Sequence, residues 1–418
     1  MNSRLAALHP YPFEKLRRLL AGVQPPADLS PVDLSIGEPK HAPPTLAVEA
    51  MLGATAGLSG YPPTKGDPAL RSAMSQWIAR RYGIPPLNPD TQILPILGSR
   101  EALFSFAQVV VDSVSGRAAD GATGATAQEA EPAYVICPNP FYQIYEGAAL
   151  LAGAEPWYLN ARPELDHGYA WEDIPVDVLR NTQLMYVCSP GNPTGRVLQF
   201  EDWKRLFELS DEYGFIIAAD ECYSEIYFDE GAPPIGALEA AYKLGRTDFR
   251  RLVSFSSLSK RSSLPGLRSG YVAGDAEVLA QFLLYRTYHG SAMSAVVAKT
   301  SIAAWNDERH VQENRRLYRD KFEAVLPVLS AALGVEKPEA AFFLWAPTPY
   351  DDTEFARDLY EATAVTVLPG SYLAREAAGI NPGKGRIRIA LVAGQEECLT
   401  AAHRIANFCS SLPHRKHQ

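Results

Sequence analysis

The feature that most constrains the fold is an alternation of short apolar runs with amphipathic stretches across the middle of the chain. The apolar runs are AYVICP (133–138), QLMYVCSP (183–190), FIIAAD (215–220), RLVSFS (251–256) and GYVAG (270–274). Between them lie stretches such as residues 200–214, where apolar residues recur at helical spacing and Gly214 supplies a stop. Such strands between helices are typical of a mainly parallel sheet covered on both faces. The sequence therefore predicts an α/β protein whose functional loops follow the carboxyl ends of strands.

The length of 418 residues is enough for two domains. We expect residues 46–290 to form a large domain that contains the sheet. Residues 1–45, rich in proline and polar residues, predict an N-terminal arm that contributes to a smaller domain. Residues 291–418 predict that small α+β domain, because a long helical passage precedes two strands and a further helix. The low-complexity segment 113–131 predicts an exposed loop.

Composition excludes several classes of function. The formal net charge of −9 disfavours nucleic-acid binding, which needs a basic stripe. No stretch approaches the about 18 uninterrupted apolar residues of a membrane span, and the N-terminus lacks the apolar core of a signal peptide. The five cysteines form no C-x-x-C pair, so neither a disulfide framework nor a zinc site is indicated. We expect a cytoplasmic protein with no metal and no membrane partner.

Polar clusters follow several predicted strands. Gly98 before a helix start would leave free N–H groups facing an anion such as phosphate, although Ser99 as a simple N-cap is the alternative. Asn192, in SPGNPTG, belongs to a rigid turn or holds an amide toward a ligand. Asp220 ends an apolar strand, where a carboxylate is costly unless a cation faces it. No histidine cluster points to a metal, so an arginine or a protonated ring nitrogen remains.

The segment SFSSLSKRSSLPGLRSG (254–270) brings Ser257, Ser259, Lys260 and Arg268 onto one loop. A lysine that is partly desolvated beside other cations has a lowered pKa and can capture a carbonyl as a Schiff base. Arg268 is suited to bidentate phosphate binding. A phosphate site, a buried carboxylate, an aldehyde-capturing amine and an amide donor together indicate pyridoxal phosphate as the cofactor.

At this point the chain resembles the class I/II aminotransferases, which are fold-type I pyridoxal-phosphate enzymes. The resemblance rests on DLSIGEP, YPPTKGDPALRSAM, GSREAL, NPFYQIYEGAALLAGA, SPGNPTG, DECYSEIYF, SFSSLSKRSSLPGLRSGY and GRIRIALV, which span nearly the whole chain in order. The segments LSIGEPKHAPP, GSREALFSFAQ, PNPFYQIYEGAALLAGA and YRTYHGSAM are more similar still to succinyldiaminopimelate aminotransferases. The family fold is a large domain with a mainly parallel central sheet plus a smaller α+β domain.

The resemblance implies roles around the cofactor ring. Lys260 would bind the cofactor covalently and then move a proton as general base. Asp220 would pair with the protonated ring nitrogen. Asn192 and Tyr223 would hydrogen-bond the phenolate oxygen of the ring. Tyr142 would stack on the ring face, for which an ordinary core aromatic is the alternative.

The resemblance also implies a phosphate site and a homodimer. The phosphate would be surrounded by Ser99, Arg100, Ser257, Ser259 and Arg268. Tyr61, in SGYPPTKG, resembles the tyrosine that reaches the phosphate of the neighbouring subunit, so the dimer would share its active sites. Residues 285–293 would lie at the same interface, where Tyr288 or His289 would approach the partner's pocket; packing is an equal alternative for His289.

For the substrate, the resemblance implies that Arg388 clamps the α-carboxylate in a bidentate pair. Strand alternation sends Arg386 to the same face, so spacing cannot separate the two, and the family pattern favours Arg388. Gly37 would let the arm's backbone approach that carboxylate, or it is a simple turn glycine. Asn192 would also contact the substrate.

The distal end of the substrate would need further cations, and Lys40, His41 and Arg100 are the candidates. A solvated Lys40 is the plainer alternative. One departure from the family is the pair Ala340 and Ala341, which stand where many relatives carry a glycine before the strand AFFLWA. This departure concerns packing of the small domain.

The expected function is therefore an aminotransferase of lysine and diaminopimelate biosynthesis. Glutamate would donate nitrogen to N-succinyl-2-amino-6-oxopimelate, giving N-succinyl-LL-2,6-diaminopimelate and 2-oxoglutarate. The alternatives are an aspartate, aromatic or alanine aminotransferase, a β-lyase on the same fold, and a non-catalytic sensor domain that binds the cofactor. The sensor is disfavoured because every chemical position is filled and no basic helix-turn-helix segment precedes residue 30.

Overall fold

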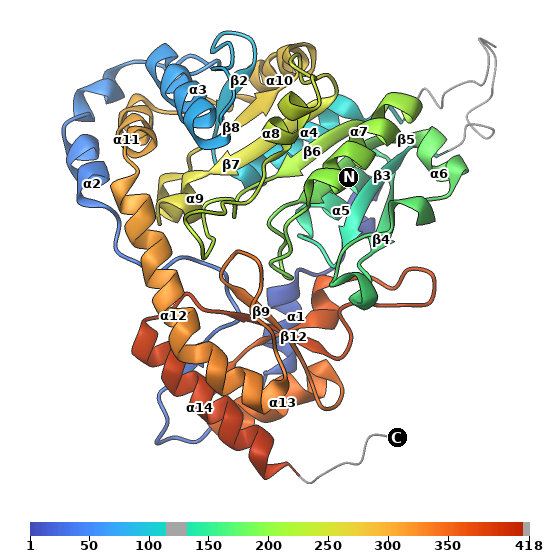
Figure 1. Cartoon of the computed structure of the whole chain (residues 1–418), viewed down its shortest axis with the longest axis vertical. Coiled ribbons are helices and arrows are strands. Elements are labelled where there is room, and N and C mark those ends of the chain that lie inside the picture. The colour runs from blue at the N-terminus through green and yellow to red at the C-terminus, as the bar shows by residue number, and fades with distance from the viewer. Residues whose placement is uncertain (114–131, 413–418) are drawn as a thin grey trace.

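The computed structural model of the protein describes residues 1–113 and 132–412. The chain forms a large domain built on a wide sheet and a smaller domain beneath it, shown in the upper and lower parts of Figure 1. The loop predicted at 113–131 lies outside the described residues apart from its first position. Among the described residues, no helix is both long and apolar enough to cross a membrane.

The centre of the large domain is a seven-stranded sheet in the order β2-β8-β7-β6-β5-β3-β4. Its strands are β2 (Ile93–Ile96), β3 (Tyr134–Asn139), β4 (Glu155–Asn160), β5 (Thr182–Cys188), β6 (Ile216–Asp220), β7 (Leu252–Ser257) and β8 (Gly270–Gly274). Strands β4, β3, β5, β6 and β7 run parallel, while β8 is antiparallel to both of its neighbours. The predicted mainly parallel sheet is confirmed. Because β8 reverses direction, β2 again points the same way as β7.

Helices cover both faces of this sheet. They are α2 (Thr45–Leu52), α3 (Pro68–Tyr82), α4 (Ser99–Val110), α5 (Ile144–Ala152), α6 (Val176–Asn181), α7 (Phe200–Tyr213), α8 (Ala237–Lys243), α9 (Leu258–Arg261), α10 (Ala276–His289) and α11 (Ala295–Asn306). The amphipathic stretch at 200–214 forms α7, which begins with a capping box between Gln199 and Asp202 and ends at Gly214, where φ is 81°.

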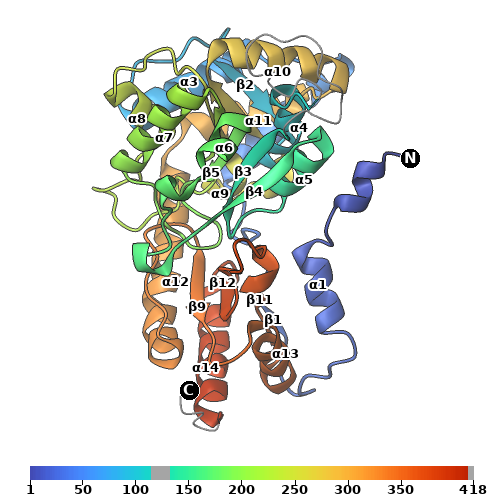
Figure 2. The ribbon, with the colours of Figure 1, turned by 90° about the vertical axis from the view of Figure 1, so that its right-hand side faces the viewer.

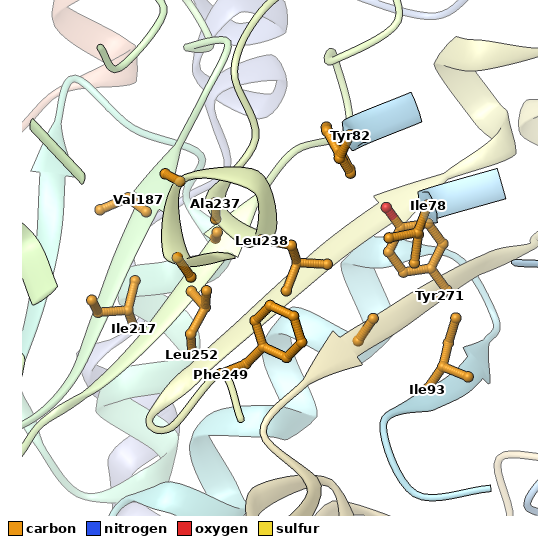
Figure 3. Close-up of a cluster of buried hydrophobic side chains, with 14 of the residues drawn as sticks. Ile78, Tyr82, Ile93, Val187, Ile217, Ala237, Leu238, Phe249, Leu252 and Tyr271 are labelled. Atoms are coloured by element: carbon orange, nitrogen blue, oxygen red, sulfur yellow. The ribbon is translucent and has the colours of Figure 1, made fainter. Parts of the chain in front are cut away.

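Each face of the sheet carries its own apolar cluster. Figure 3 shows part of the first, where Leu238 of α8 and Ile78 of α3 lie against side chains of the strands, among them Leu252 and Tyr271. Both strand residues are fully buried. Burial on both faces explains why the strands read as continuous apolar runs instead of alternating with polar residues.

The small domain is built on the antiparallel sheet β11-β12-β9, with β9 (Phe343–Pro347), β11 (Leu368–Pro369) and β12 (Arg386–Ala390). Its helices are α12 (Arg309–Leu333), α13 (Asp352–Thr363) and α14 (Gln395–Ser411). The N-terminal arm joins this domain, because β1 (Val32–Asp33) pairs in parallel with β10 (Val365–Thr366). Figure 2 shows α1 (Pro12–Leu19) beside the small domain.

The packing of α11 bears on the domain boundary expected near residue 290. Met293, Ala298 and Trp305 belong to the apolar cluster of the large domain, where the indole of Trp305 lies 4.9 Å from that of Trp77. Helix α12 then runs from the large domain down into the small one (Figure 1). We therefore propose that the boundary falls at the start of α12 instead of at residue 291.

The two alanines that depart from the family pattern lie where the domains meet. Ala341 has a positive φ of 67°, a conformation that favours glycine. Its N–H donates to the carbonyl of Ile226, and the N–H of Ala340 donates to that of Gly195. These two bonds tie the segment before β9 to loops of the large domain, which holds the strained residue in place.

Candidate active site

A cavity of about 480 Å³ opens at the carboxyl ends of β2, β3, β5, β6 and β7, between the two domains. It is lined by Tyr11, Pro12, Phe13, Ile36, Gly37, Glu38, Ser99, Arg100, Tyr142, Gln143, Asn192, Asp220, Cys222, Tyr223, Ser257, Ser259, Lys260, Pro265, Arg268, Phe343, Leu373 and Arg388. Most residues predicted from the sequence therefore meet in one place. Parallel strands bring them together because their carboxyl ends share one edge of the sheet.

Lys260 lies in the short helix α9, directly after β7, and is partly buried. Its Nζ donates a hydrogen bond to the carbonyl oxygen of Gly37, 3.1 Å away. Burial is the main cause that lowers the pKa of the amine to about 8; the guanidinium groups of Arg268 and Arg388 contribute to the lowering, and Cys222 and Glu38 oppose it. A sizeable neutral fraction near pH 7.5 makes this amine a competent nucleophile.

Asp220 ends β6 with its carboxylate almost fully buried. The hydroxyl of Tyr145 donates to Oδ2 at 2.7 Å, and the backbone N–H of Cys222 donates to Oδ1 at 3.2 Å. Burial raises the pKa of Asp220, while hydrogen bonds from the Cys222 side chain, the Tyr145 hydroxyl and the Cys222 backbone, and the charge of Lys260, oppose this rise. These donors are neutral groups, so the carboxylate still needs a cation in the cavity.

An anion site lies where α4 and α9 begin. Gly98, not Ser99, is the N-cap of α4, and no side chain caps the free N–H groups there. The Ser99 alternative as a plain N-cap is therefore wrong. Ser257 caps α9 by accepting from the N–H of Ser259, and its hydroxyl also bonds that of Ser259 at 2.8 Å. Arg268 completes the group, with Nη1 donating to the carbonyl of Pro265.

Gly98 is required by its surroundings as well as by its conformation. It has a φ of 84°, and a Cβ at this position would lie 2.1 Å from Nη2 of Arg268. The backbone of the α4 turn and the guanidinium therefore share one small space. Free N–H groups at a helix start and a guanidinium beside them form a suitable cradle for a phosphate.

Arg388 lies on β12 at the opposite wall, buried to 4% exposure. Its Nη2 donates to the carbonyl of Ser35 at 2.6 Å and its Nη1 to Oδ1 of Asn192 at 2.9 Å, while Nε has no hydrogen-bond partner among the described residues. Burial lowers the pKa of this guanidinium to about 10. Arg386 bonds the carbonyl of Trp345 instead and lines a separate pocket. Strand spacing could not distinguish Arg386 from Arg388, but the structure does, because only Arg388 of the two lines the cavity.

The aromatic wall comes from several segments. Tyr142 accepts a 2.5 Å hydrogen bond from Nε of Arg100, whose guanidinium also lies over the ring of Tyr11 in the arm. Tyr223 is buried and packs edge-on against Phe343 at a centroid distance of 5.4 Å. A Cβ on Gly37 would lie 2.8 Å from the Phe343 ring, so close approach explains this glycine better than a turn does.

Several predicted residues do not line this cavity. Tyr61 and Lys40 are exposed and lie outside it. His41 faces away, with Nδ1 bonded to Asn314 and Nε2 accepting from Nζ of Lys321 at 2.7 Å, so it packs the arm onto α12. For His289, Nδ1 meets the hydroxyl of Ser291 at 2.6 Å.

Other cavity residues had no sequence prediction. Tyr11, Phe13 and Glu38 come from the arm, where no strand or helix pattern points to a site. Cys222 lies two positions after Asp220, a spacing that could have been used. Tyr145, which does not itself line the cavity, donates a hydrogen bond to Asp220 and was also not predicted. Its position three residues after Tyr142 could have indicated that it lies near the site.

Comparison with known proteins places this geometry in a family. The profile of the family "Aminotransferase class I and II" matches residues 30–405. The chain belongs to this family, whose members use pyridoxal phosphate, and it is accordingly a transaminase that depends on this cofactor. The fold-type I architecture agrees.

Individual relatives cover nearly the whole chain. It is 29% identical to an LL-diaminopimelate aminotransferase of Dehalococcoides mccartyi, over 98% of this chain and 99% of that protein. It is 31% identical to a probable aminotransferase of Mycobacterium tuberculosis, over 96% and 86%. A crystal structure of an aminotransferase from Neisseria meningitidis is similar with a TM-score of 0.91 and 49% identity, covering 98% of this chain and 100% of that one.

The cavity fits pyridoxal phosphate on its own chemistry. The uncapped N-terminus of α4 with Arg268 suits the phosphate. Asp220 offers a buried carboxylate whose hydrogen-bond donors in the described chain are neutral, and Lys260 offers an amine with a lowered pKa. Arg388 lines the cavity with a guanidinium whose hydrogen-bond partners in the described residues are neutral, which suits a second anion such as an amino-acid carboxylate.

We predict that Gly98→Ala weakens cofactor binding about tenfold, because the new methyl group displaces the Arg268 guanidinium from the phosphate site. The measurement is a titration of apoenzyme with pyridoxal phosphate. The matched control is Gly83→Ala, since Gly83 also has a positive φ but no atom lies within 4 Å of its Cβ position. Equal losses of affinity in both variants would show that backbone strain alone is responsible.

Proposed function

We propose that the cavity residues carry the transamination as follows. Lys260 holds the cofactor covalently, Asp220 pairs with the ring nitrogen, and Asn192 and Tyr223 bond the phenolate oxygen. The α4 turn, Ser257, Ser259 and Arg268 hold the phosphate, and Tyr142 covers the ring face. The burial of Asp220 beside neutral donors only is the observation that carries this assignment.

When bound, pyridoxal phosphate supplies a carbonyl group and a ring that stabilises negative charge on the substrate α-carbon. Arg388 binds the substrate carboxylate and fixes the α-carbon near Lys260. Nζ of Lys260 would take the proton from the substrate α-carbon and return it to complete the transfer of the amino group. Its lowered pKa keeps part of the amine neutral and basic at physiological pH.

We propose that the substrates are dicarboxylic, with glutamate as donor and the N-succinyl-diaminopimelate pair as partner. Besides Arg268, which we place at the phosphate, two guanidinium groups line the cavity from different domains. Arg388 is buried and suits the α-carboxylate. Arg100 is exposed, and its hydrogen-bond partner in the described chain is the neutral Tyr142, so it is available to a distal carboxylate.

A second candidate is LL-diaminopimelate itself, the substrate named for several relatives. Glu38 favours it, because this exposed carboxylate lines the same cavity and would attract the free ammonium that succinylation removes. Arg100 would still bind the distal carboxylate. The two candidates differ in whether Glu38 helps or hinders binding.

The deciding experiment is a half-reaction screen of holoenzyme by visible absorption. We expect glutamate and N-succinyl-LL-2,6-diaminopimelate to bleach the cofactor band faster than aspartate, phenylalanine or alanine. A faster response to unacylated LL-diaminopimelate would favour the second candidate. Bleaching by aspartate or phenylalanine alone would reject both, and release of pyruvate and ammonia would indicate a lyase. Lys260→Ala should bind the cofactor only non-covalently and show no turnover.

We predict that Arg100→Ala raises KM for glutamate about five- to tenfold, because one partly solvated ion pair is lost. The KM for alanine, which has no distal carboxylate, should change less than twofold. Steady-state kinetics with both donors checks this. Arg316→Ala, on the exposed face of α12, is the control for loss of a surface arginine. Equal changes for both donors would exclude a distal role for Arg100.

We propose further that two chains form a dimer with shared active sites. Residues 48–61 expose a run of large apolar side chains on α2 and the 3₁₀ turn η2 (Thr55–Ser59): Val48, Met51, Leu52, Leu58 and Tyr61. Such a run on a soluble domain supports an interface. Tyr61 is fully exposed, so its hydroxyl is available to the phosphate of a partner. A cytoplasmic location also remains a proposal, supported by five free thiols.

We predict that Tyr61→Phe leaves the native mass at twice the 45.7 kDa of the chain but weakens cofactor affinity about tenfold, because a phosphate hydrogen bond is lost. Light scattering and apoenzyme titration provide the two readouts. Tyr242→Phe, which changes an exposed tyrosine on α8 outside the proposed interface, is the matched control. A fully active monomer would contradict shared active sites.

A further inference from the structure

Tyr145 stands behind the active site without reaching it. Its hydroxyl donates to Oδ2 of Asp220 at 2.7 Å. The residue is fully buried and does not line the cavity. It therefore contacts neither cofactor nor substrate, and its connection to the chemistry runs through Asp220.

The ring of Tyr145 is held rigidly. It stacks on Tyr186 with a centroid distance of 4.6 Å and an interplanar angle of 11°. Tyr186 is fixed in turn by its own hydroxyl, which donates to the carbonyl of Leu103 at 2.6 Å. On its other side Tyr145 meets Tyr142 edge-on at 5.8 Å. The donor to Asp220 thus has little freedom to move.

The carboxylate that receives this bond has few other ways to be satisfied. Asp220 is 4% exposed, and its other donors in the described chain are the backbone N–H of Cys222, at Oδ1, and the thiol of the same residue. Without Tyr145, the carboxylate would keep only the Cys222 donors and a cation in the cavity. A buried carboxylate that loses a donor rotates or takes up a proton, because its charge is no longer compensated.

We propose that Tyr145 is a positioning residue for the reaction: its hydroxyl orients the Asp220 carboxylate and keeps it ionised against the ring nitrogen of the cofactor. This inference rests on the assignment of Asp220 to the ring nitrogen. Loss of the hydroxyl would leave that nitrogen less protonated. The ring would then withdraw electrons less strongly, and removal of the α-proton by Lys260 would slow.

The test is the variant Tyr145→Phe, which keeps the stacked ring and removes only the hydroxyl. Holoenzyme is reconstituted with cofactor labelled with ¹⁵N in the ring, and its nitrogen resonance is recorded. We expect a protonated nitrogen in the wild type and a shift toward the neutral position in Tyr145→Phe. The glutamate half-reaction should slow at least tenfold while the covalent cofactor band persists.

Tyr186→Phe is the matched control, since it removes a neighbouring buried hydroxyl that bonds Leu103 and not Asp220. Its nitrogen resonance should match the wild type. Asp220→Ala separates the two proposals. If its resonance stays protonated, the assignment of Asp220 is wrong. If it becomes neutral while Tyr145→Phe keeps a wild-type resonance and a rate within twofold, only the role of Tyr145 is overturned.

If Tyr145→Phe does not yield folded holoenzyme, 3,5-difluorotyrosine placed at position 145 gives the same answer with minimal change in shape. Its more acidic hydroxyl donates more strongly to Asp220. The ring-nitrogen resonance should then move away from the neutral position relative to wild type at a pH where both forms are populated. An unchanged resonance would overturn the proposal.

Discussion

The rest of the site depends on two buried charged side chains, Asp220 and Arg388, that form no ion pair with another residue of the described chain. Asp220 and Arg388 are each about 4% exposed, and the hydrogen-bond partners of both in the described residues are neutral groups. Burying an ion without a counterion costs several kcal/mol, roughly, so folding alone does not favour this arrangement. A cationic ring nitrogen and an anionic substrate carboxylate would supply the missing charges. Ligand binding would therefore stabilise the folded state as well as permit the reaction.

The two charges come from different domains, which gives the cleft its function. Asp220 ends a strand of the large sheet, and Arg388 lies on β12 of the small one. Arg388 reaches across to Asn192, a large-domain residue, and to the carbonyl of Ser35 in the arm. A substrate carboxylate bound there would contact groups from both domains and the arm together. The contacts that bind the substrate would therefore also hold the two domains in position relative to each other.

Much of this was visible in the sequence because strand ends in a parallel sheet share one edge. The apolar runs predicted the sheet, and the polar residues after each run, such as Asn192, Asp220 and Lys260, could be assigned to one edge without knowing the strand order. The antiparallel direction of β8 could not be read, since a fully buried run has no face preference. His41 was misassigned because its partner Lys321 is distant in sequence, and no local pattern reports such a contact.

The groups that sequence missed share a physical character: they act on a reacting residue from behind. Tyr145 lies in a helix with an ordinary apolar face, so its pattern is that of a core aromatic until its hydroxyl is seen to reach Asp220. The free N–H groups after Gly98 were predicted from the sequence, but only the structure shows that the lack of a Cβ there lets Arg268 lie against the α4 backbone. Residues that touch a ligand are conspicuous for being polar at a strand end. The residues that position these ligand-contacting side chains are buried and look like ordinary core residues in the sequence. Only their three-dimensional contacts distinguish them from the rest of the core.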